Sequence, residues 1–232
     1  MSEPVSTGCE PVDDLLGGGF SRGGATQVYG PPAAGKTNLV LSAAAETTAR
    51  GESALYIDTE GLSADRMEQV LSARARMADM DVDELAARLI ITDAHGFEEQ
   101  REAVQDATNL AEEVDLILLD SATGFYRLVR TEREEGEALR AVASQITHLL
   151  SLARKHDLAV AFTNQVYTDP ESDGVRALGG HTLNHWSSAI LRLDRFRGGN
   201  RRATLEKHDA KEAGDTAQFR ITDAGIAAAD RR

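Results

Sequence analysis

Residues 29–37 read Tyr-Gly-Pro-Pro-Ala-Ala-Gly-Lys-Thr, and this stretch decides the fold. Gly30, Gly35, Lys36 and Thr37 fill the pattern G-x-x-x-x-G-K-[ST], whose glycines let consecutive backbone N–H groups turn toward phosphate oxygens. The segment Ala25–Tyr29 before it predicts a buried strand, and apolar residues at helical spacing follow it. Because the motif is complete and lies between a strand and a helix, we prefer a phosphate-binding loop to a glycine turn without a ligand.

The chemistry of a bound nucleotide explains the residue types in this loop. The helix that follows presents its positive end to the phosphates, and Lys36 would reach the β- and γ-phosphates. The Thr37 hydroxyl would complete the shell of a Mg²⁺ ion, and we expect Lys36 to act in catalysis as well as in binding. The expected nucleotide contacts in the loop are Gly30, Pro31, Pro32, Ala33, Ala34, Gly35, Lys36, Thr37 and Asn38.

Length and composition limit the class of protein. At 232 residues the chain has the size of one α/β domain, and 41% hydrophobic residues are typical of a soluble globular protein. No apolar run approaches the ~18–20 residues of a membrane span, and no signal peptide opens the sequence. The only cysteine, Cys9, excludes an internal disulfide and fits a reducing compartment. We therefore expect a cytoplasmic protein without a membrane partner.

The charge balance is strongly acidic. The chain has 25 basic against 38 acidic residues, a formal net charge of −13, and its lysines are Lys36, Lys155, Lys207 and Lys211 alone. This balance by itself argues against a nucleic-acid partner, since phosphates attract a basic surface. An acidic, lysine-poor surface is also what a high-salt cytoplasm favours, where molar salt shortens the Debye length to ~3 Å. The net charge is thus weak evidence about binding partners. The acidic composition also fits a protein from a halophile.

The remaining sequence predicts a mostly parallel sheet. Short apolar stretches predict strands at 25–29, 54–57, 89–92, 116–119 and 158–162. Helical patterns lie at 6–16, 36–51, 82–88 and 97–113. A further helix starts at residue 63, and a long helix ends at about residue 156. Alternation of strands and helices indicates a parallel sheet covered by helices on both faces. Further strands at 190–193, 203–206 and 218–221 are joined by tight turns, which predicts an antiparallel extension. No linker divides the chain, so we expect a single α/β domain over residues 1–232.

Several of these strands end in residues suited to nucleotide hydrolysis. The strand at 116–119 ends at Asp120, whose carboxylate we expect to reach the Mg²⁺ shell, with a turn-capping role as the alternative. Glu60 is the expected base for the attacking water, because parallel-sheet sites form at the carboxyl ends of strands. Asp58 is the rival base, and helix capping is the alternative for Glu60. Gln165 ends a further strand, where its amide could sense the γ-phosphate.

A series of motifs in fixed order carries a family resemblance. They are Thr7-Gly-Cys9, Leu15-Leu-Gly-Gly-Gly19, the phosphate-binding loop, Tyr56-Ile-Asp-Thr-Glu-Gly61, Leu116-Ile-Leu-Leu-Asp-Ser121, Thr163-Asn-Gln-Val166 and Gly179-Gly-His-Thr182. From about Ser6 to Ile226 this order resembles the core of the RecA/RadA recombinase family, above all its short archaeal members. The resemblance implies a RecA-like P-loop ATPase core that binds ATP. It also implies that Glu60 is the catalytic carboxylate, that Gln165 links ATP to DNA, and that Arg66 stacks on adenine.

The chain also departs from that family. The full recombinases carry an N-terminal helical DNA-binding domain and a Phe-x-x-Ala hook that docks on the next protomer, and we expect neither in the lead of residues 1–5. Their longer second DNA loop corresponds to residues 166–178, which carry Asp169, Glu171 and Asp173 against Arg176 alone. The segment before Arg66 is shorter than in the family, which weakens the adenine assignment.

Clustered arginines are the candidate DNA contacts. Local concentrations of arginine can bind phosphates even in an acidic protein, and solvated arginines paired with carboxylates are the alternative. By resemblance, the first DNA loop holds Arg127, Arg130 and Arg133, and a second cluster surrounds the turn at 198–200. The expected DNA contacts are Arg127, Arg130, Arg133, Arg176, Arg195, Arg197, Arg201 and Arg202.

Taken together, the sequence predicts an ATP-binding accessory protein of homologous recombination and DNA repair. We expect weak Mg²⁺-dependent hydrolysis, binding to single-stranded or branched DNA, and no strand exchange by the protein alone. A full-length recombinase or a junction-processing nuclease is the expected protein partner. One alternative is an active strand-exchange recombinase, and another is a KaiC-like signalling ATPase, which shares the glycine-rich entry and the phosphate-binding loop.

Overall fold

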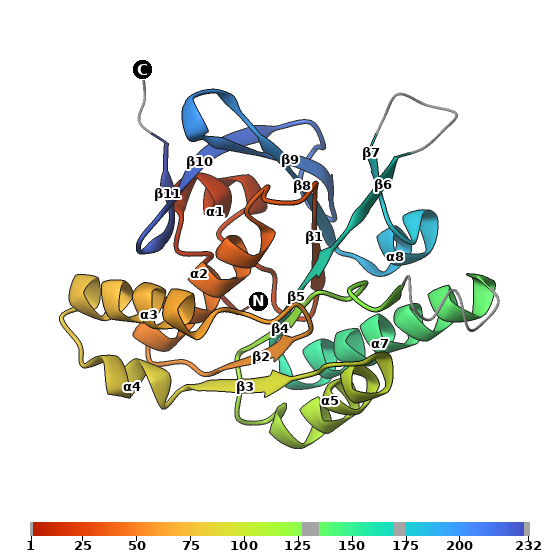
Figure 1. The fold of residues 1–232 in the computed structure, drawn as a ribbon, viewed down its shortest axis with the longest axis horizontal. Coiled ribbons are helices and arrows are strands. Elements are labelled where there is room, and N and C mark those ends of the chain that lie inside the picture. Colours follow the sequence, from red (N-terminus) through yellow and green to blue (C-terminus); the bar gives the residue numbers. More distant parts are fainter. Residues whose placement is uncertain (1, 127–134, 169–174, 230–232) are drawn as a thin grey trace.

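A nine-stranded sheet forms the centre of the molecule in the computed structural model, which describes residues 2–126, 135–168 and 175–229 (Figure 1). Its strands are β1 (Ala25–Tyr29), β2 (Ala54–Asp58), β3 (Leu89–Asp93), β4 (Leu116–Asp120), β5 (Ala159–Asn164), β8 (Ala189–Arg195), β9 (Arg201–His208), β10 (Thr216–Thr222) and β11 (Gly225–Ala228). Their order across the sheet is β11-β10-β9-β8-β1-β5-β4-β2-β3. From β8 to β3 the neighbours are parallel, and β9, β10 and β11 pair antiparallel. The predicted fold class is confirmed.

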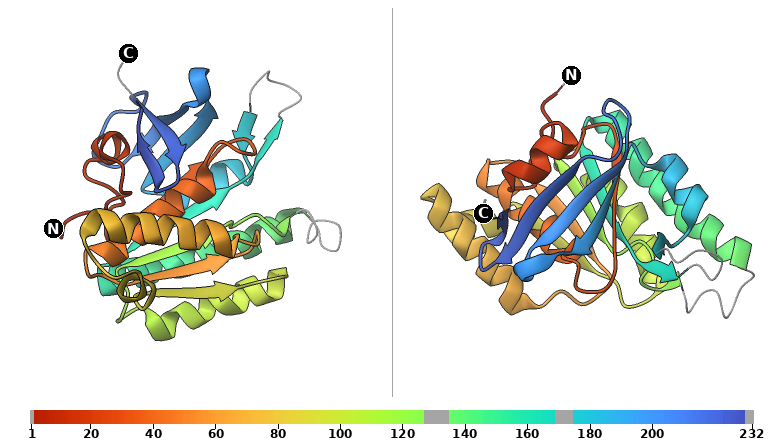
Figure 2. Two further views of the ribbon diagram at one scale, coloured as in Figure 1. Left: turned by 60° about the vertical axis from the view of Figure 1, so that its left-hand side comes forward. Right: turned by 90° about the horizontal axis from the view of Figure 1, so that it is seen from above.

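Helices cover both faces of the sheet (Figure 2). The helices are α1 (Glu10–Leu16), α2 (Lys36–Ala49), α3 (Ala64–Ala78), α4 (Val82–Ala86), α5 (Phe97–Leu110), α7 (Glu135–His156) and α8 (Gly180–Trp186). Alternation along β4 shows the two layers: Ile117 and Leu119 join the core under α5 and α7, whereas Leu116 and Leu118 join the core under α1 and α2. Asp120 continues the second series and therefore ends β4 on the α2 face. No helix in the described ranges is long and apolar enough to cross a membrane.

Several elements differ from the sequence-based expectation, among them α8, at whose residues no helix was expected. Residues 166–178 were expected to be a loop, but β6 (Val166–Thr168) and β7 (Val175–Ala177) form an antiparallel hairpin that projects from the sheet (Figure 1). β11 was not predicted, because Ile226 is its one β-branched residue and glycine and alanine, which are depleted in strands, make up the rest. The hairpin strands and β11 are short, and each pairs with a strand that is its neighbour in the sequence.

The helix that begins in the phosphate-binding loop is enclosed on all sides. Leu39, Val40, Ala43 and Ala44 of α2 pack on the sheet, while the opposite side packs on α3 and α4. Apolar side chains of α2 are buried on two opposite sides of the helix, and the small Ala43, Ala44 and Ala45 let its neighbours approach closely. The phosphate-binding loop is therefore attached to the most buried helix of the fold.

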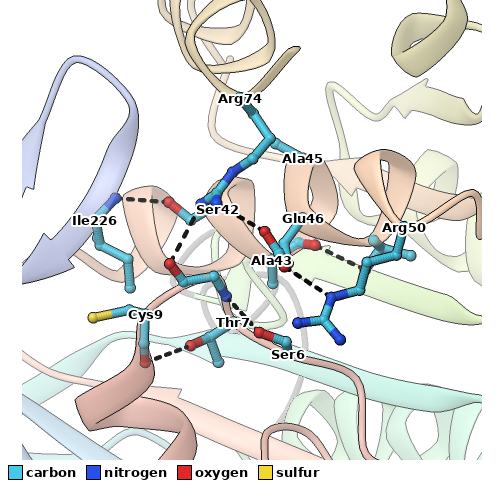
Figure 3. A network of polar contacts seen from close by, with 12 residues as sticks. Ser6, Thr7, Cys9, Ser42, Ala43, Ala45, Glu46, Arg50, Arg74 and Ile226 are labelled. Atoms are coloured by element: carbon cyan, nitrogen blue, oxygen red, sulfur yellow. Dashed lines mark hydrogen bonds and ion pairs between the residues drawn. The ribbon is translucent and has the colours of Figure 1, made fainter. Parts of the chain in front are cut away.

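A polar network fixes the far end of α2 (Figure 3). Glu46 of α2 pairs with Arg74 of α3 at 2.8 Å, and the Arg74 guanidinium also donates to the carbonyl oxygen of Gly8 at 3.3 Å. Ser42 Oγ accepts the backbone N–H of Ile226 at 2.8 Å. These contacts connect α2 to the N-terminal segment, α3 and β11. They hold α2 in place behind the phosphate-binding loop.

We predict that Gly225→Ala strongly destabilises the fold. A Cβ atom at Gly225 would lie 1.9 Å from Ser42 Oγ, and the residue has φ of +99°. The matched control is Gly51→Ala, since Gly51 also has a positive φ of +84° but open space around it. Gly51→Ala should lower the free energy of unfolding by about 1–2 kcal/mol through strain alone, and Gly225→Ala by about 1–3 kcal/mol more. Equal losses in urea unfolding would contradict this role of the contact with Ser42.

Candidate nucleotide-binding site

The phosphate-binding loop lies where β1 ends and α2 begins, at the carboxyl edge of the parallel strands. A Cβ atom at Gly30 would lie 2.2 Å from the carbonyl oxygen of Leu193 in β8, so only glycine fits there. Gly35 precedes α2 with φ of +103°, a conformation that also favours glycine. The loop lines a cavity of about 410 Å³ together with Glu60 and Gln165. The structure thus brings three separately predicted segments to one cavity.

Lys36 points into the curve of its own loop. Its Nζ donates to the carbonyl oxygens of Gly30 at 2.9 Å and Pro31 at 3.3 Å. Burial lowers the pKa of Lys36, and the charges of Glu60 and Asp120 oppose that effect. The ammonium group therefore lies inside the loop, where its positive charge would complement an anionic ligand.

Asp120 is a fully buried carboxylate held by hydroxyl groups. It is 1% exposed and accepts from Tyr56 Oη at 2.8 Å, from Thr163 Oγ1, and from the side chain of Thr37. Burial raises the pKa of Asp120, and the three hydroxyl donors act against that rise. A buried carboxylate beside a threonine hydroxyl on the cavity wall is a donor set of hard oxygens, which fits Mg²⁺. Thr37 and Asp120 are the residues that would hold the ion.

Glu60 lies on the exposed rim of the same cavity. Its Oε1 accepts from Ser121 Oγ at 2.8 Å and from Gln165 Nε2 at 3.0 Å. The structure thus joins the predicted base to the predicted sensor of the γ-phosphate by a direct hydrogen bond. The two residues come from the ends of β2 and β5, which are separated by β4 in the sheet.

The rival base, Asp58, has a different role. Its carboxylate is 5% exposed and accepts the backbone N–H groups of Glu60 at 3.0 Å, Gly61 at 3.1 Å and Leu62. Asp58 does not line the cavity at the phosphate-binding loop. It fixes the turn that carries Glu60, which favours Glu60 over Asp58 as the base.

Arg66 is bound to the protein beside the start of α2. Its guanidinium donates to Asn38 Oδ1 from Nε at 3.0 Å and from Nη2 at 2.6 Å, and to the carbonyl oxygen of Thr222 at 2.7 Å. Burial lowers the pKa of Arg66. Arg66 therefore connects α2 to the turn between β10 and β11, and its predicted contact with adenine stays a prediction.

The arginines of the second cluster fall into two groups. Strand alternation puts Arg195 and Arg201, which are paired in register, on the α1 and α2 face, and Arg202 on the opposite face. Arg201 Nε donates to the carbonyl oxygen of Ala33 in the phosphate-binding loop at 3.3 Å. Arg202 lies 3.8 Å from Asp194, and its guanidinium stacks over Phe196. These four residues of the expected DNA set (Arg195, Arg197, Arg201, Arg202) thus do not form one flat patch.

The other expected DNA contacts are less defined. Arg176 is exposed on β7, opposite Tyr167 of β6. Arg127, Arg130 and Arg133 lie outside the described residues. Within the described part of the chain, Arg195 and Arg197 are exposed and form no ion pair.

Sequence reasoning missed several side chains of the site. Tyr56 and Thr163 bind Asp120, and Ser121 binds Glu60. Register could have suggested one of them, because Tyr56 opposes Leu118 in β4, two residues before Asp120 and on the same face of the sheet. Ser121 gives no sequence signal beyond its place after Asp120.

Comparisons with known proteins agree with this geometry. The Rad51 family profile matches residues 3–229. The chain is 60% identical over 228 residues to the DNA repair and recombination protein RadB of Halobacterium salinarum, covering 97% of this chain and 95% of that protein. It is 40% identical over 228 residues to the protein of the same name from Methanococcoides burtonii, covering 97% of this chain and 98% of that protein. The halophile origin expected from the acidic composition fits the first match.

A solved structure is similar over the same length. The crystal structure of the RadB recombinase superposes with a TM-score of 0.81 at 35% identity, covering 97% of this chain and 100% of the solved one. These matches favour the recombination side of the sequence-based alternatives over a signalling ATPase. With a family match across nearly its whole length and relatives well above 30% identity, the chain belongs to the Rad51 family of RecA-like recombination and repair proteins.

Proposed function

We propose that the protein binds Mg²⁺-ATP and DNA, hydrolyses ATP slowly, and serves homologous recombination as an accessory factor. The observation that carries the nucleotide part is the cavity at the phosphate-binding loop, which is lined by Lys36, Thr37, Glu60 and Gln165. Anion-binding backbone, a cation, a metal-binding hydroxyl and a base candidate meet there, as phosphoryl transfer requires.

Each residue has a defined task in the proposed hydrolysis. The N-terminus of α2 and the Lys36 ammonium bind the phosphate oxygens and stabilise the negative charge that develops on them. Mg²⁺, held by Thr37 and Asp120, would neutralise further charge on the phosphates. Glu60 orients the attacking water and accepts its proton. Because Glu60 is exposed on the rim, the site excludes bulk water poorly. Poor exclusion of water supports slow turnover in the protein alone.

The DNA part of the proposal is supported by the arginines and by the relatives. The matched proteins are named DNA repair and recombination proteins. Arg195 and Arg197 are exposed near the turn that precedes β9, without a carboxylate partner in the described residues, so they are available for phosphates. We expect single-stranded or branched DNA as the ligand, and a full-length recombinase or junction-processing nuclease as the protein partner.

The accessory role rests on the charge of the segment after Gln165. Stretching DNA within a recombinase filament calls for cationic contacts with its backbone. Residues 166–178 instead contain Asp169, Glu171 and Asp173 against Arg176. The nucleotide cavity is kept, and a nucleotide in it can alter the hydrogen bond between Glu60 and Gln165. Gln165 is followed directly by the β6–β7 hairpin. Nucleotide binding could therefore change a surface that a partner reads.

We predict that Glu60→Gln abolishes ATP hydrolysis but keeps ATP binding. The amide cannot accept the proton of the attacking water, so kcat should fall about a hundredfold or more, while the contacts with the phosphates remain. Glu84→Gln, on the exposed surface of α4, is the control and should leave both quantities unchanged. Steady-state hydrolysis and nucleotide titration measure the two effects. Hydrolysis at the wild-type rate in Glu60→Gln would show that another group is the base.

A second prediction concerns salt. Each phosphate contact on single-stranded DNA contributes about −0.7 to the slope of log affinity against log salt. Replacing Arg195 and Arg197 with glutamine should therefore make the slope about 1.4 less steep. The control replaces Arg76 and Arg154, which are exposed on α3 and α7, and removes the same charge. Equal slopes for the two double variants would mean that Arg195 and Arg197 do not contact DNA.

We also predict that the purified protein does not exchange DNA strands by itself. The acidic segment after Gln165 would repel the phosphates that a filament must hold. The measurement is a strand-exchange assay with ATP at high salt, with and without a cognate full-length recombinase. Stimulation or inhibition of the recombinase supports the accessory role. Efficient exchange by this protein alone would restore the alternative of an active recombinase.

A further inference from the structure

Ser121 lies outside the phosphate-binding motif but at the centre of the site. It follows Asp120 at the end of β4 and is 0% exposed. Its Oγ donates to Glu60 Oε1 at 2.8 Å, and Gln165 Nε2 donates to the same oxygen at 3.0 Å. One oxygen of the base candidate is thus bound by two donors that come from two different strands.

The other oxygen of Glu60 has no such partner. Within the described residues, Oε2 accepts no hydrogen bond, while Glu60 lines the cavity with Lys36 and Thr37. A carboxylate that serves as a base needs one oxygen free to accept a proton. The two hydrogen bonds to Oε1 fix the carboxylate and leave Oε2 free to accept the proton of the attacking water.

Ser121 is itself held firmly. Thr59 Oγ1 donates to the carbonyl oxygen of Ser121 at 2.9 Å and accepts the backbone N–H of Ser121 at 2.7 Å. A Cβ atom at Gly124 would lie 2.9 Å from Thr59 Oγ1 and 3.3 Å from Ser121 Oγ, so glycine leaves room for both hydroxyls. The Ser121 hydroxyl is therefore a fixed donor. The other donor, Gln165, is half-buried and lies directly before the projecting β6–β7 hairpin.

We propose that Ser121 is a positioning residue for ATP hydrolysis, which holds Glu60 Oε1 so that Oε2 faces the attacking water. This inference rests on the proposed function of the site. In the reaction, the water oxygen bonds to the γ-phosphorus and the bond from that phosphorus to the bridging β–γ oxygen breaks. The water proton passes to Glu60 Oε2, and ADP and phosphate leave. Ser121 touches none of the reacting atoms. When Gln165 turns toward the γ-phosphate, Ser121 is the donor that remains.

The test is the kinetics of Ser121→Ala. Loss of one positioning hydrogen bond should lower kcat about three- to tenfold, while KM for ATP changes by less than about twofold, because the phosphate contacts are untouched. The matched control is Ser187→Ala. Ser187 is also buried, at 1% exposure, and its Oγ donates to the Leu183 carbonyl oxygen at 2.9 Å, away from the cavity. The control should change neither quantity.

Ser121→Cys keeps the proposal open to refutation if Ser121→Ala is poorly folded, and a double variant tests whether the two donors act together. Ser121→Cys keeps a weak donor in similar volume and should recover part of the lost kcat. Ser121→Ala combined with Gln165→Ala removes both donors to Oε1, so kcat should fall by more than the product of the single losses. Unchanged kcat in both Ser121 variants, or an equal loss in Ser187→Ala, overturns this role of Ser121. A wild-type protein that does not hydrolyse ATP overturns the proposed function itself, and the inference with it.

Discussion

One close approach determines where the nucleotide site lies: the backbone of Gly30 rests against the carbonyl oxygen of Leu193. The parallel pairing of β1 with β8 brings the ends of both strands to the same edge, so the loop leaves β1 against the end of β8. A Cβ atom at Gly35 would lie 3.3 Å from Ile221 Cδ1 of β10, and Arg201 of β9 reaches the carbonyl oxygen of Ala33. The antiparallel extension is therefore the outer wall of the phosphate-binding loop.

A second constraint is the burial of Asp120 on the α2 face. An ionised carboxylate away from water is costly unless donors satisfy it, and hydroxyls from Tyr56, Thr163 and Thr37 do so. These donors come from β2, β5 and α2, so each of those elements must keep its register for the carboxylate to stay bound. The same geometry that stabilises the buried charge aligns the residues that would hold Mg²⁺.

The sequence predicted what depends on local pattern. The strand Ala25–Tyr29, the helix after the loop and the helix that starts near residue 63 follow from periodicity and from the glycines of the loop, and the structure has them at those places. The site residues on strand ends, such as Glu60 and Gln165, meet because parallel strands share an edge. Ser121 and Arg201 could not be assigned in this way. Ser121 contacts a residue 61 positions away in the sequence, and Arg201 contacts one 168 positions away. Patterns in a single sequence carry no information about such contacts.

Strand alternation also bears on how DNA and nucleotide would communicate. Arg195 and Arg201 are direct partners across β8 and β9 and share a face, and Arg201 touches the phosphate-binding loop. Under the proposed function, a DNA phosphate at Arg195 would lie next to a residue that contacts the apex of the loop. Arg202 is on the other face, where Asp194 and Phe196 engage it. Coupling through Arg201 needs no long path through the core, because β9 itself joins the two sites.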